Sequence, residues 1–246
     1  AGRNNFKFFT PVMNVEASER LQKEANLKLA YANKDFINHY QPVVDSILGK
    51  AVGVELLMRW QDGDKLIAPS DFIPLSEELG LIIPMTEDAL EQGISDLKQW
   101  REIRPNMFLS VNLAPQHFAK ENLALYISSL LAEKNLPANA LKIEVTESAL
   151  LSEPKKSINT MRKLSEIGVI IALDDFGTGF SSLSYLKKLP LDIIKIDRSF
   201  VSGIGIEETD EAIVDATLVL AKRLKMSCIA EGVETKEQLD YLAANQ

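Results

Sequence analysis

The sequence predicts an α/β barrel, in which parallel strands alternate with helices. Short apolar runs alternate along the chain with stretches of helical length, which is the pattern of repeated strand–helix units. The length of 246 residues fits one such domain. Most tellingly, six apolar runs end in acidic or amide side chains, and barrels build their sites at the carboxyl ends of strands. These strand-end groups are Glu55, Asn112, Glu144, Asp174-Asp175, Asp197 and Glu231.

The strands and helices follow in order from the amino terminus. Residues 1–9 predict a turn and a short strand, and residues 16–33 carry scattered leucines among charges, as a surface or linker helix does. The main domain begins near Phe36 with a strand in which Pro42 favours a sheet edge or the entry to the barrel. Helices then alternate with the strands, and we expect them near residues 70–79, 86–102, 119–134, 154–167, 181–189, 209–224 and 235–242.

Two helix boundaries have local signals. Thr86 is a suitable residue to begin a helix, and Gly168 is a natural stop before the next strand. Both assignments use only the neighbouring residues.

The bulk composition excludes some classes of protein. The net charge of −8 argues against a surface for duplex DNA or RNA, which would be basic. The single cysteine, Cys228, lies in an apolar run and predicts a structural thiol in a reducing compartment. The sequence contains no signal peptide and no run of about 18 apolar residues. We therefore expect the chain to be soluble and cytoplasmic. Whether a longer parent protein is anchored in a membrane stays open.

Strand alternation places the strand-end groups on one surface, because successive side chains point to opposite faces. In residues 107–112 the odd-numbered positions are apolar and suit packing under helices, so Ser110 and Asn112 face the interior. The same choice in the other strands gives an interior set that consists of Glu55, Arg59, Glu144, Asp174, Lys195, Asp197 and Glu231.

Carboxylates gathered on one interior surface predict bound cations, because without them the acids would repel one another and lose hydration. Oxygen ligands suit Mg²⁺ or Mn²⁺ better than zinc, and there is no His/Cys cluster. The adjacent pair Asp174-Asp175 offers ligands to two ions at once, which suits phosphodiester cleavage. For an isolated Asp-Asp pair, a helix cap or a solvated turn is the alternative.

Further side chains extend this interpretation. Lys195 is suited to orienting a water molecule or binding the scissile phosphate, with a structural ion pair as the alternative. Glu231 is the better candidate for the base. Arg59 would grip a phosphate or form a surface ion pair, and Gln41 would supply an amide to a ligand.

The loop that begins at Asp175 is glycine-rich. Gly177 and Gly179 permit tight turns, but a third glycine typical of a nucleotide-binding loop is absent. We interpret the loop as a lid, or as a link between a dimer contact and the site. Glu147, just past Glu144, is placed to hydrogen-bond this loop.

Seven segments together match one known family in order and spacing. They are Tyr40-Gln41-Pro42-Val43-Val44, Glu55-Leu56-Leu57-Met58-Arg59-Trp60, Ser110-Val111-Asn112-Leu113, Glu144-Val145-Thr146-Glu147, Asp174-Asp175-Phe176-Gly177-Thr178-Gly179, Lys195-Ile196-Asp197 and Glu231-Gly232-Val233-Glu234. This set resembles the EAL-domain cyclic-di-GMP phosphodiesterases. The triplet that names the family is Glu-Leu-Leu here, and because Leu56 faces the helices we expect little effect on the chemistry.

The resemblance implies a TIM-like (β/α)8 barrel with one antiparallel strand, and hydrolysis of cyclic di-GMP to linear pGpG with two Mg²⁺ or Mn²⁺ ions. It also implies roles for individual residues. Lys195 and Glu231 resemble the residues that position and activate water, with Glu55 beside them, and Glu147 resembles a support for the loop. The expected metal ligands are Glu55, Asn112, Glu144, Asp174, Asp175 and Glu231, and the expected substrate contacts are Gln41, Leu57, Arg59, Asp197 and Glu234.

The resemblance further predicts how the chain is organised. Gly2-Arg3-Asn4 and the aromatic run behind it are similar to the end of a GGDEF domain. We therefore expect residues 1–14 to be the tail of an upstream GGDEF-like domain, 15–35 a linker helix and 36–246 the EAL phosphodiesterase domain. The family continues beyond Gln246 with a strand and a helix, so we expect a barrel without its closing strand. A homodimer, and an upstream GGDEF or sensory domain in the parent, are also expected.

Two alternatives to the phosphodiesterase stay open. A degenerate member of the family would bind cyclic di-GMP and transmit a signal without cleaving it, although such receptors usually lack metal ligands or the Asp-Asp loop. An unrelated metal-dependent barrel, such as an aldolase or a lyase, would act on carbon substrates. The complete ligand set favours the phosphodiesterase.

Overall fold

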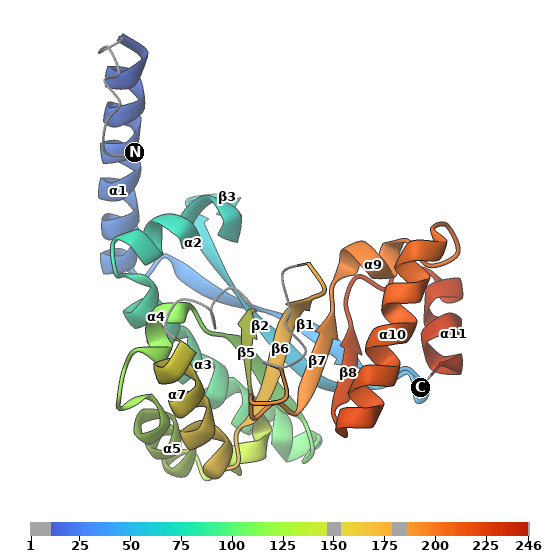
Figure 1. Ribbon diagram of the computed structural model, residues 1–246. Coiled ribbons are helices and arrows are strands. Elements are labelled where there is room, and N and C mark those ends of the chain that lie inside the picture. The colour runs from blue at the N-terminus through green and yellow to red at the C-terminus, as the bar shows by residue number, and fades with distance from the viewer. Residues whose placement is uncertain (1–10, 147–153, 179–185, 246) are drawn as a thin grey trace. The chain divides into compact units, whose positions relative to one another are not determined.

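The computed structural model describes residues 11–146, 154–178 and 186–245, and the chain divides into two compact units (Figure 1). The first unit comprises Ala1–Ile37 and Met58–Met85, and the second comprises Asn38–Leu57 and Thr86–Gln246. The predicted turn and strand at residues 1–9, the loop residue Glu147 and most of the predicted helix 181–189 lie outside the described residues.

The first unit packs two helices and a short hairpin around aromatic side chains. Helix α1 (Pro11–Asn33) and helix α2 (Pro69–Glu78) accompany the antiparallel pairing of β2 (Ala51–Asp62) with β3 (Lys65–Ile67). Phe72 is fully buried, with the rings of Phe36 and Trp60 at centroid distances of 5.4 and 6.2 Å. The helix expected over residues 16–33 is therefore present, and it begins earlier, at Pro11.

The second unit contains a mostly parallel sheet. Its strand order is β1 (Phe36–Val44), β2, β4 (Phe108–Asn112), β5 (Leu141–Thr146), β6 (Ile170–Phe176), β7 (Ile193–Ile196) and β8 (Ser227–Ala230). Every pairing from β2 to β8 along this path is parallel. A short turn joins β1 to its neighbour β2, and in it the Asp45 amide donates to the Lys50 carbonyl at 2.9 Å. Neighbouring strands joined this tightly run antiparallel, as expected for one strand of this fold.

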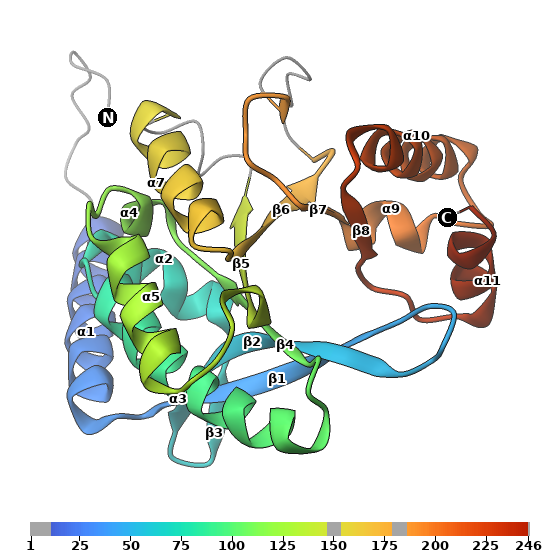
Figure 2. The same cartoon turned by 90° about the horizontal axis from the view of Figure 1, so that it is seen from below.

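The sheet of this unit curls, and it is open in the part of the chain that the structure describes. Strands β1 and β8 are the two ends of the strand order, and in the described residues they do not pair with each other. Seen from below, the strands turn progressively from β1 and β2 round to β8 (Figure 2). The predicted fold class is confirmed as a curled α/β sheet of the kind found in TIM-like barrels. The gap between β8 and β1 agrees with the expectation of a missing closing strand.

Helices cover the convex side of this sheet (Figure 2). Leu109, Ile143 and Ile194, which strand alternation predicted to face the helices, are completely buried. Among its described residues, the helices of the unit are α3 (Ile82–Ile103), α4 (Pro115–Phe118), α5 (Leu123–Glu133), η1 (Ala138–Ala140), α7 (Pro154–Glu166), α9 (Arg198–Ser202), α10 (Glu208–Leu224) and α11 (Lys236–Ala244). The first residues of α3 belong to the other unit.

Some boundaries differ from those expected. Helix α3 begins at Ile82 and not at Thr86, which is a buried residue inside the helix. Pro84 is tolerated because it lies in the first turn, where a backbone N–H has no helical partner to lose. The expected helix 119–134 is α5, which begins only at Leu123. A separate short helix, α4, precedes it and ends at Phe118. The Gly168 stop is confirmed, with a φ of +92° that favours glycine.

The last strand and helices share a small core of their own. Ile196, Val201, Val214 and Leu242 are buried together, and Cys228 of β8 packs against them. Burial raises the pKa of the Cys228 thiol to about 11, which fits a structural role. Among the described residues, no helix combines the length and the apolar character needed to cross a membrane.

Candidate active site

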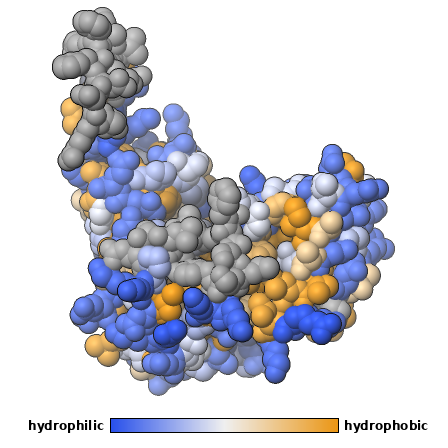
Figure 3. All heavy atoms as spheres, in the orientation of Figure 1, coloured by the Kyte–Doolittle hydropathy of each residue, from blue (hydrophilic) through white to orange (hydrophobic). Residues whose placement is uncertain are grey.

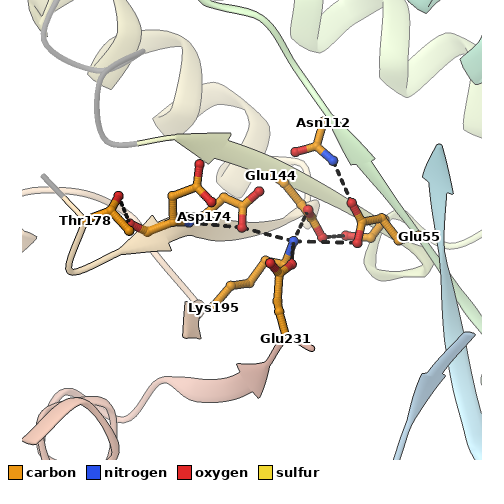
Figure 4. Close-up of polar contacts among 9 residues, drawn as sticks. Glu55, Asn112, Glu144, Asp174, Thr178, Lys195 and Glu231 are labelled. Carbon is orange, nitrogen blue, oxygen red and sulfur yellow. Dashed lines mark hydrogen bonds and ion pairs between the residues drawn. The ribbon is translucent and has the colours of Figure 1, made fainter. Parts of the chain in front are cut away.

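Four carboxylates meet at one lysine in the second unit, three of them on strands β2, β5 and β6 and one directly after β8 (Figure 4). Nζ of Lys195 lies 2.5 Å from Oε2 of Glu144 and 2.5 Å from Oε1 of Glu231. The same atom lies 3.0 Å from Oδ1 of Asp174 and 3.6 Å from Oε2 of Glu55. The lysine side chain is 3% exposed, so this is a buried cluster that carries a formal charge of −3 when all five groups are ionised.

The sheet brings these groups together through its register. Asn112 of β4 is paired with Glu144 of β5, and Thr146 with Asp174 of β6. Two polar side chains of β4 complete the cluster. Ser110 donates a hydrogen bond to Oε1 of Glu144, and Nδ2 of Asn112 donates to Oε1 of Glu55 at 2.8 Å. Of the interior set predicted from strand alternation, the structure therefore brings together Glu55, Glu144, Asp174, Lys195 and Glu231.

The interior next to the acids is filled by side chains. The Lys142 ammonium lies 3.4 Å from the ring centroid of Phe108, a cation–π contact. Burial lowers the pKa of Lys142 to about 8, despite nearby Glu144 and Asp192. Gly53 makes room for the ring, because a Cβ there would lie 2.3 Å from it. A residue with a side chain at position 53 would therefore displace Phe108.

Asp175 joins the site through an irregular backbone. Strict alternation would turn adjacent residues Asp174 and Asp175 to opposite faces. The β6–β7 register shifts between Leu173 and Phe176, and Asp175 adopts a left-handed φ of +54°. The Asp175 amide donates to Oδ1 of Asp174 at 3.0 Å. As a result, carboxylate oxygens of Asp174, Asp175 and Glu231 all lie within 4.8 Å of one another.

Hydrogen bonds from Thr178 hold this turn. Its hydroxyl donates to the Asp175 carbonyl at 2.9 Å, and its amide donates to the same carbonyl at 3.3 Å. Gly177 between them has a φ of +97°. A strained φ at a residue of the site is a common feature of functional sites. The turn therefore positions the Asp175 carboxylate.

The electrostatics keep Lys195 charged. Burial alone would lower the pKa of Lys195, but the carboxylates of Glu144, Asp174, Glu55 and Glu231 outweigh it and raise the pKa above its ordinary value. Because four carboxylates share one ammonium, each acid receives only part of its stabilisation. Burial accordingly raises the pKa of Glu144 to about 7, and it also raises the pKa of Glu231. With these carboxylates around it, Lys195 is a cation and a hydrogen-bond donor.

The donor chemistry fits divalent metal. Asp174, Asp175 and Glu231 offer hard oxygen ligands within a few ångströms of one another, and such ligands suit Mg²⁺ or Mn²⁺. Glu55 and Glu144 lie next to these three acids, because both contact Lys195. Asn112 is connected to the group by its hydrogen bond to Glu55.

The expected substrate contacts are more scattered. Gln41 is exposed on β1, and Leu57 is half-buried two residues beyond Glu55 on β2. Asp197 caps α9 by accepting from the Ser199 amide at 3.0 Å, and its charge contributes to a raised pKa at Asp175 after the larger effects of burial and Asp174. Glu234 is exposed before α11.

Arg59 belongs to the first unit, where its guanidinium donates to the Met58 carbonyl at 2.9 Å. No contact among the described residues tests these roles. The role expected for Glu147 lies outside the described residues.

Two residues were not anticipated from the sequence. Ser110 was placed on the interior face, but its contact with Glu144 was not predicted. Thr178 was seen only as part of a loop, although its position three residues after Asp175 matches a turn-stabilising hydroxyl. Strand alternation places Ser110 on the same face as the acids, but it does not predict which carboxylate the hydroxyl contacts.

The family comparison agrees with this geometry. A model of the EAL domain family matches residues 24–246. The chain belongs to the EAL domain family. This EAL domain is 38% identical over 243 residues to the bifunctional diguanylate cyclase/cyclic di-GMP phosphodiesterase MucR of Pseudomonas aeruginosa, a match covering 98% of this chain and 36% of that protein. It is 34% identical over 245 residues to the cyclic di-GMP phosphodiesterase PdeR of Escherichia coli, covering 99% of this chain and 37% of that protein.

Solved structures give the same result for the fold of the EAL domain. The structure of the PaMucR phosphodiesterase in complex with c-di-GMP matches it with a TM-score of 0.85 at 36% identity, covering 91% of each chain. The EAL enzyme Bd1971 in its cAMP and cyclic-di-GMP bound form matches with a TM-score of 0.88 at 28% identity, covering 93% of this chain and 63% of that one. The chain spans about a third of the length of the curated relatives it matches.

Proposed function

We propose that this EAL domain is a phosphodiesterase that hydrolyses cyclic di-GMP to linear pGpG with the help of two Mg²⁺ or Mn²⁺ ions. The observation that carries this proposal is the convergence of four strand-end carboxylates and Asp175 around Lys195. The two relatives named above support the substrate, since both are called cyclic di-GMP phosphodiesterases.

The metal ions would be held by the oxygen ligands predicted from the sequence. These are Glu55, Asn112, Glu144, Asp174, Asp175 and Glu231, of which Asp174, Asp175 and Glu231 are already close enough to share an ion. When bound, such ions supply positive charge that polarises a phosphodiester and lowers the pKa of water. The remaining chemistry falls to the protein's own side chains.

Lys195 and Glu231 have complementary roles in this proposal. The Lys195 ammonium keeps its proton, so it orients the attacking water or binds a phosphate oxygen by donating hydrogen bonds. Glu231 is the most exposed of the four carboxylates that Lys195 contacts, at 28% of its side chain. It is therefore the one best placed to accept the proton of the water whose oxygen bonds to phosphorus as one P–O3′ bond breaks.

The substrate contacts stay proposals. Leu57 shares the strand face of Glu55 because the two residues are two positions apart on β2. Gln41 supplies an exposed amide, and Arg59 supplies a guanidinium suited to phosphate. Asp197 and Glu234 complete the proposed set. An upstream GGDEF or sensory domain in the parent protein is proposed from the sequence resemblance alone. A cytoplasmic location is proposed from the sequence composition alone.

A homodimer is also proposed, through α10. Ile213 of this helix is 36% exposed, and apolar residues gather over this part of the molecule in the space-filling view (Figure 3). Exposed apolar surface of this kind favours association with a partner. Ile213 is also close to the loop, because a Cβ at Gly177 would lie 3.8 Å from its Cγ2. A dimer contact at α10 would therefore reach the turn that positions Asp175.

A turnover assay tests the proposed function. Wild type should convert cyclic di-GMP to pGpG with Mg²⁺ or Mn²⁺, as measured by chromatography. Glu55→Gln should lose metal affinity, and Lys195→Met should keep metal but lose roughly 100-fold or more in rate. Glu133→Gln is the matched control, because Glu133 is a surface residue of α5 with a 68% exposed side chain.

The outcomes separate the alternatives. Cyclic di-GMP binding without any pGpG in the presence of metal would identify a silent receptor and reject the enzyme. Activity on carbon substrates without cyclic di-GMP binding would identify an unrelated barrel enzyme. Because Lys195 contacts four carboxylates, its removal also threatens folding, so thermal unfolding of each variant must accompany the rates.

A further inference from the structure

We infer that Ser110 is a positioning residue that fixes the carboxylate of Glu144 for metal binding. The inference rests on the proposed function, because it concerns the metal ligands of that site. Ser110 is 1% exposed and Glu144 is 2% exposed, so both side chains are shielded from bulk solvent. The hydroxyl of Ser110 donates to Oε1 of Glu144.

The two oxygens of Glu144 have different partners. Oε2 lies 2.5 Å from Nζ of Lys195, while Oε1 receives the Ser110 hydroxyl. The carboxylate is therefore held at both ends by donors from two different strands, β4 and β7. A carboxylate held in this way cannot rotate about its terminal bond without breaking one hydrogen bond, so the direction of its remaining lone pairs is fixed.

Loss of the hydroxyl would leave Oε1 without this donor. A buried carboxylate oxygen that lacks a hydrogen bond is unfavourable. The carboxylate would then turn to share Lys195 between both oxygens, which redirects the lone pairs that a metal ion would use. Side chains that orient metal ligands in this way commonly contribute 10-fold to 100-fold to metal affinity.

The sheet explains why position 110 can play this part. Asn112 and Glu144 are register partners on β4 and β5, and Ser110 is two residues earlier on β4. It therefore faces the same side as Asn112 and reaches Glu144 diagonally. Asn112 makes the equivalent contact with Glu55 on the neighbouring strand β2, at 2.8 Å. One strand thus orients an acid on each of its two neighbours.

The test is a titration of the protein with Mn²⁺ alone, followed by calorimetry. Ser110→Ala should weaken Mn²⁺ binding by roughly 10-fold. Ser110→Thr keeps the hydroxyl on a strand that accepts β-branched residues, and it should bind Mn²⁺ within about 3-fold of wild type. Ser76→Ala is the matched control, since Ser76 is also fully buried but donates to the Ile73 carbonyl at 2.7 Å in the other unit.

The results distinguish this inference from the proposed function. If wild type fails to bind Mn²⁺, the metal-dependent function is rejected and the inference is rejected with it. If wild type binds but Ser110→Ala binds equally well, only the role of Ser110 is rejected. An equal loss in Ser76→Ala would also reject it, because a general effect of removing buried hydroxyls would then explain the change. Should Ser110→Ala not fold, Ser110→Cys preserves the side-chain size with a weaker donor and is titrated in its place.

Discussion

At the residue scale, Glu144 sets how the site responds to pH. Burial raises its pKa to about 7, and Lys195 offsets only part of that effect. A metal ion binds the ionised carboxylate, so below pH 7 it competes with a proton. Mn²⁺ affinity should therefore rise between pH 6 and pH 8, by roughly 10-fold if this group alone is responsible.

Calorimetric titration with Mn²⁺ at the two pH values measures this effect. Burial also raises the pKa of Glu231 and of Asp175, so protons at these acids act in the same direction. Glu144→Gln cannot titrate and should show a shallower dependence on pH. Equal affinity of wild type at pH 6 and pH 8 would contradict the prediction.

At the element scale, the end of β6 shows what alternation can and cannot predict. In regular strands the period of two is strict, and it located Ser110, Asn112, Glu144 and Lys195 on one face. It fails at Asp175, because the register shift and the positive φ depend on contacts made by the rest of the fold. The sequence suggested the role of Asp175 only through its neighbours in the motif.

Helix and hairpin boundaries had the same limit. Thr86 has the chemistry of a helix start, yet α3 begins four residues earlier, where Pro84 fits the first turn. The three-residue strand β3 was not predicted, because so short a run carries no measurable alternation. The contacts of Gln41 and Arg59 could not be predicted from the sequence either, because the partner of a side chain depends on which other segments of the fold lie near it.

Gly177 and Gly205 provide a matched pair of tests for the turn after β6. Both have positive φ, +97° and +82°, so alanine at either position should destabilise the protein by roughly 1–2 kcal/mol. A Cβ at Gly177 would also lie 3.0 Å from Cε2 of Phe200, whereas a Cβ at Gly205 would have no neighbour within 4 Å. Gly177→Ala should therefore move the turn and weaken Mn²⁺ binding, and Gly205→Ala should not.

Urea unfolding and Mn²⁺ titration of the two variants separate backbone strain from damage to the site. If both variants bind Mn²⁺ as tightly as wild type, the turn at Gly177 does not control Asp175. If both lose binding equally, global destabilisation is the cause.

At the scale of the whole molecule, the proposed dimer links surface to site. Ile213→Asp places a charge in the exposed apolar surface of α10 and should shift a dimer to monomer, because burying an unpaired carboxylate is unfavourable. Sedimentation velocity over a range of concentrations measures this. Lys222→Asp, an exposed change on the same helix, controls for a general effect of added negative charge.

The functional part of the dimer prediction has its own readout. If α10 couples association to the turn beside Gly177, then Ile213→Asp should lower the turnover rate along with the dimer fraction. A wild-type monomer that is fully active in dilute solution would contradict the coupling between association and activity. If Ile213→Asp stays dimeric, the dimer contact does not lie at Ile213.

Cys228 has a practical consequence for following these changes in solution. Burial raises the pKa of its thiol from about 9 to about 11. At neutral pH its thiolate, which is the form that maleimide dyes attack, is therefore roughly 100-fold scarcer than that of an exposed cysteine. A cysteine introduced at the exposed Lys187, in the segment after the glycine-rich loop, would thus carry a fluorophore selectively. The native thiol can stay in place, and the dye would report movements of that segment during titration in real time.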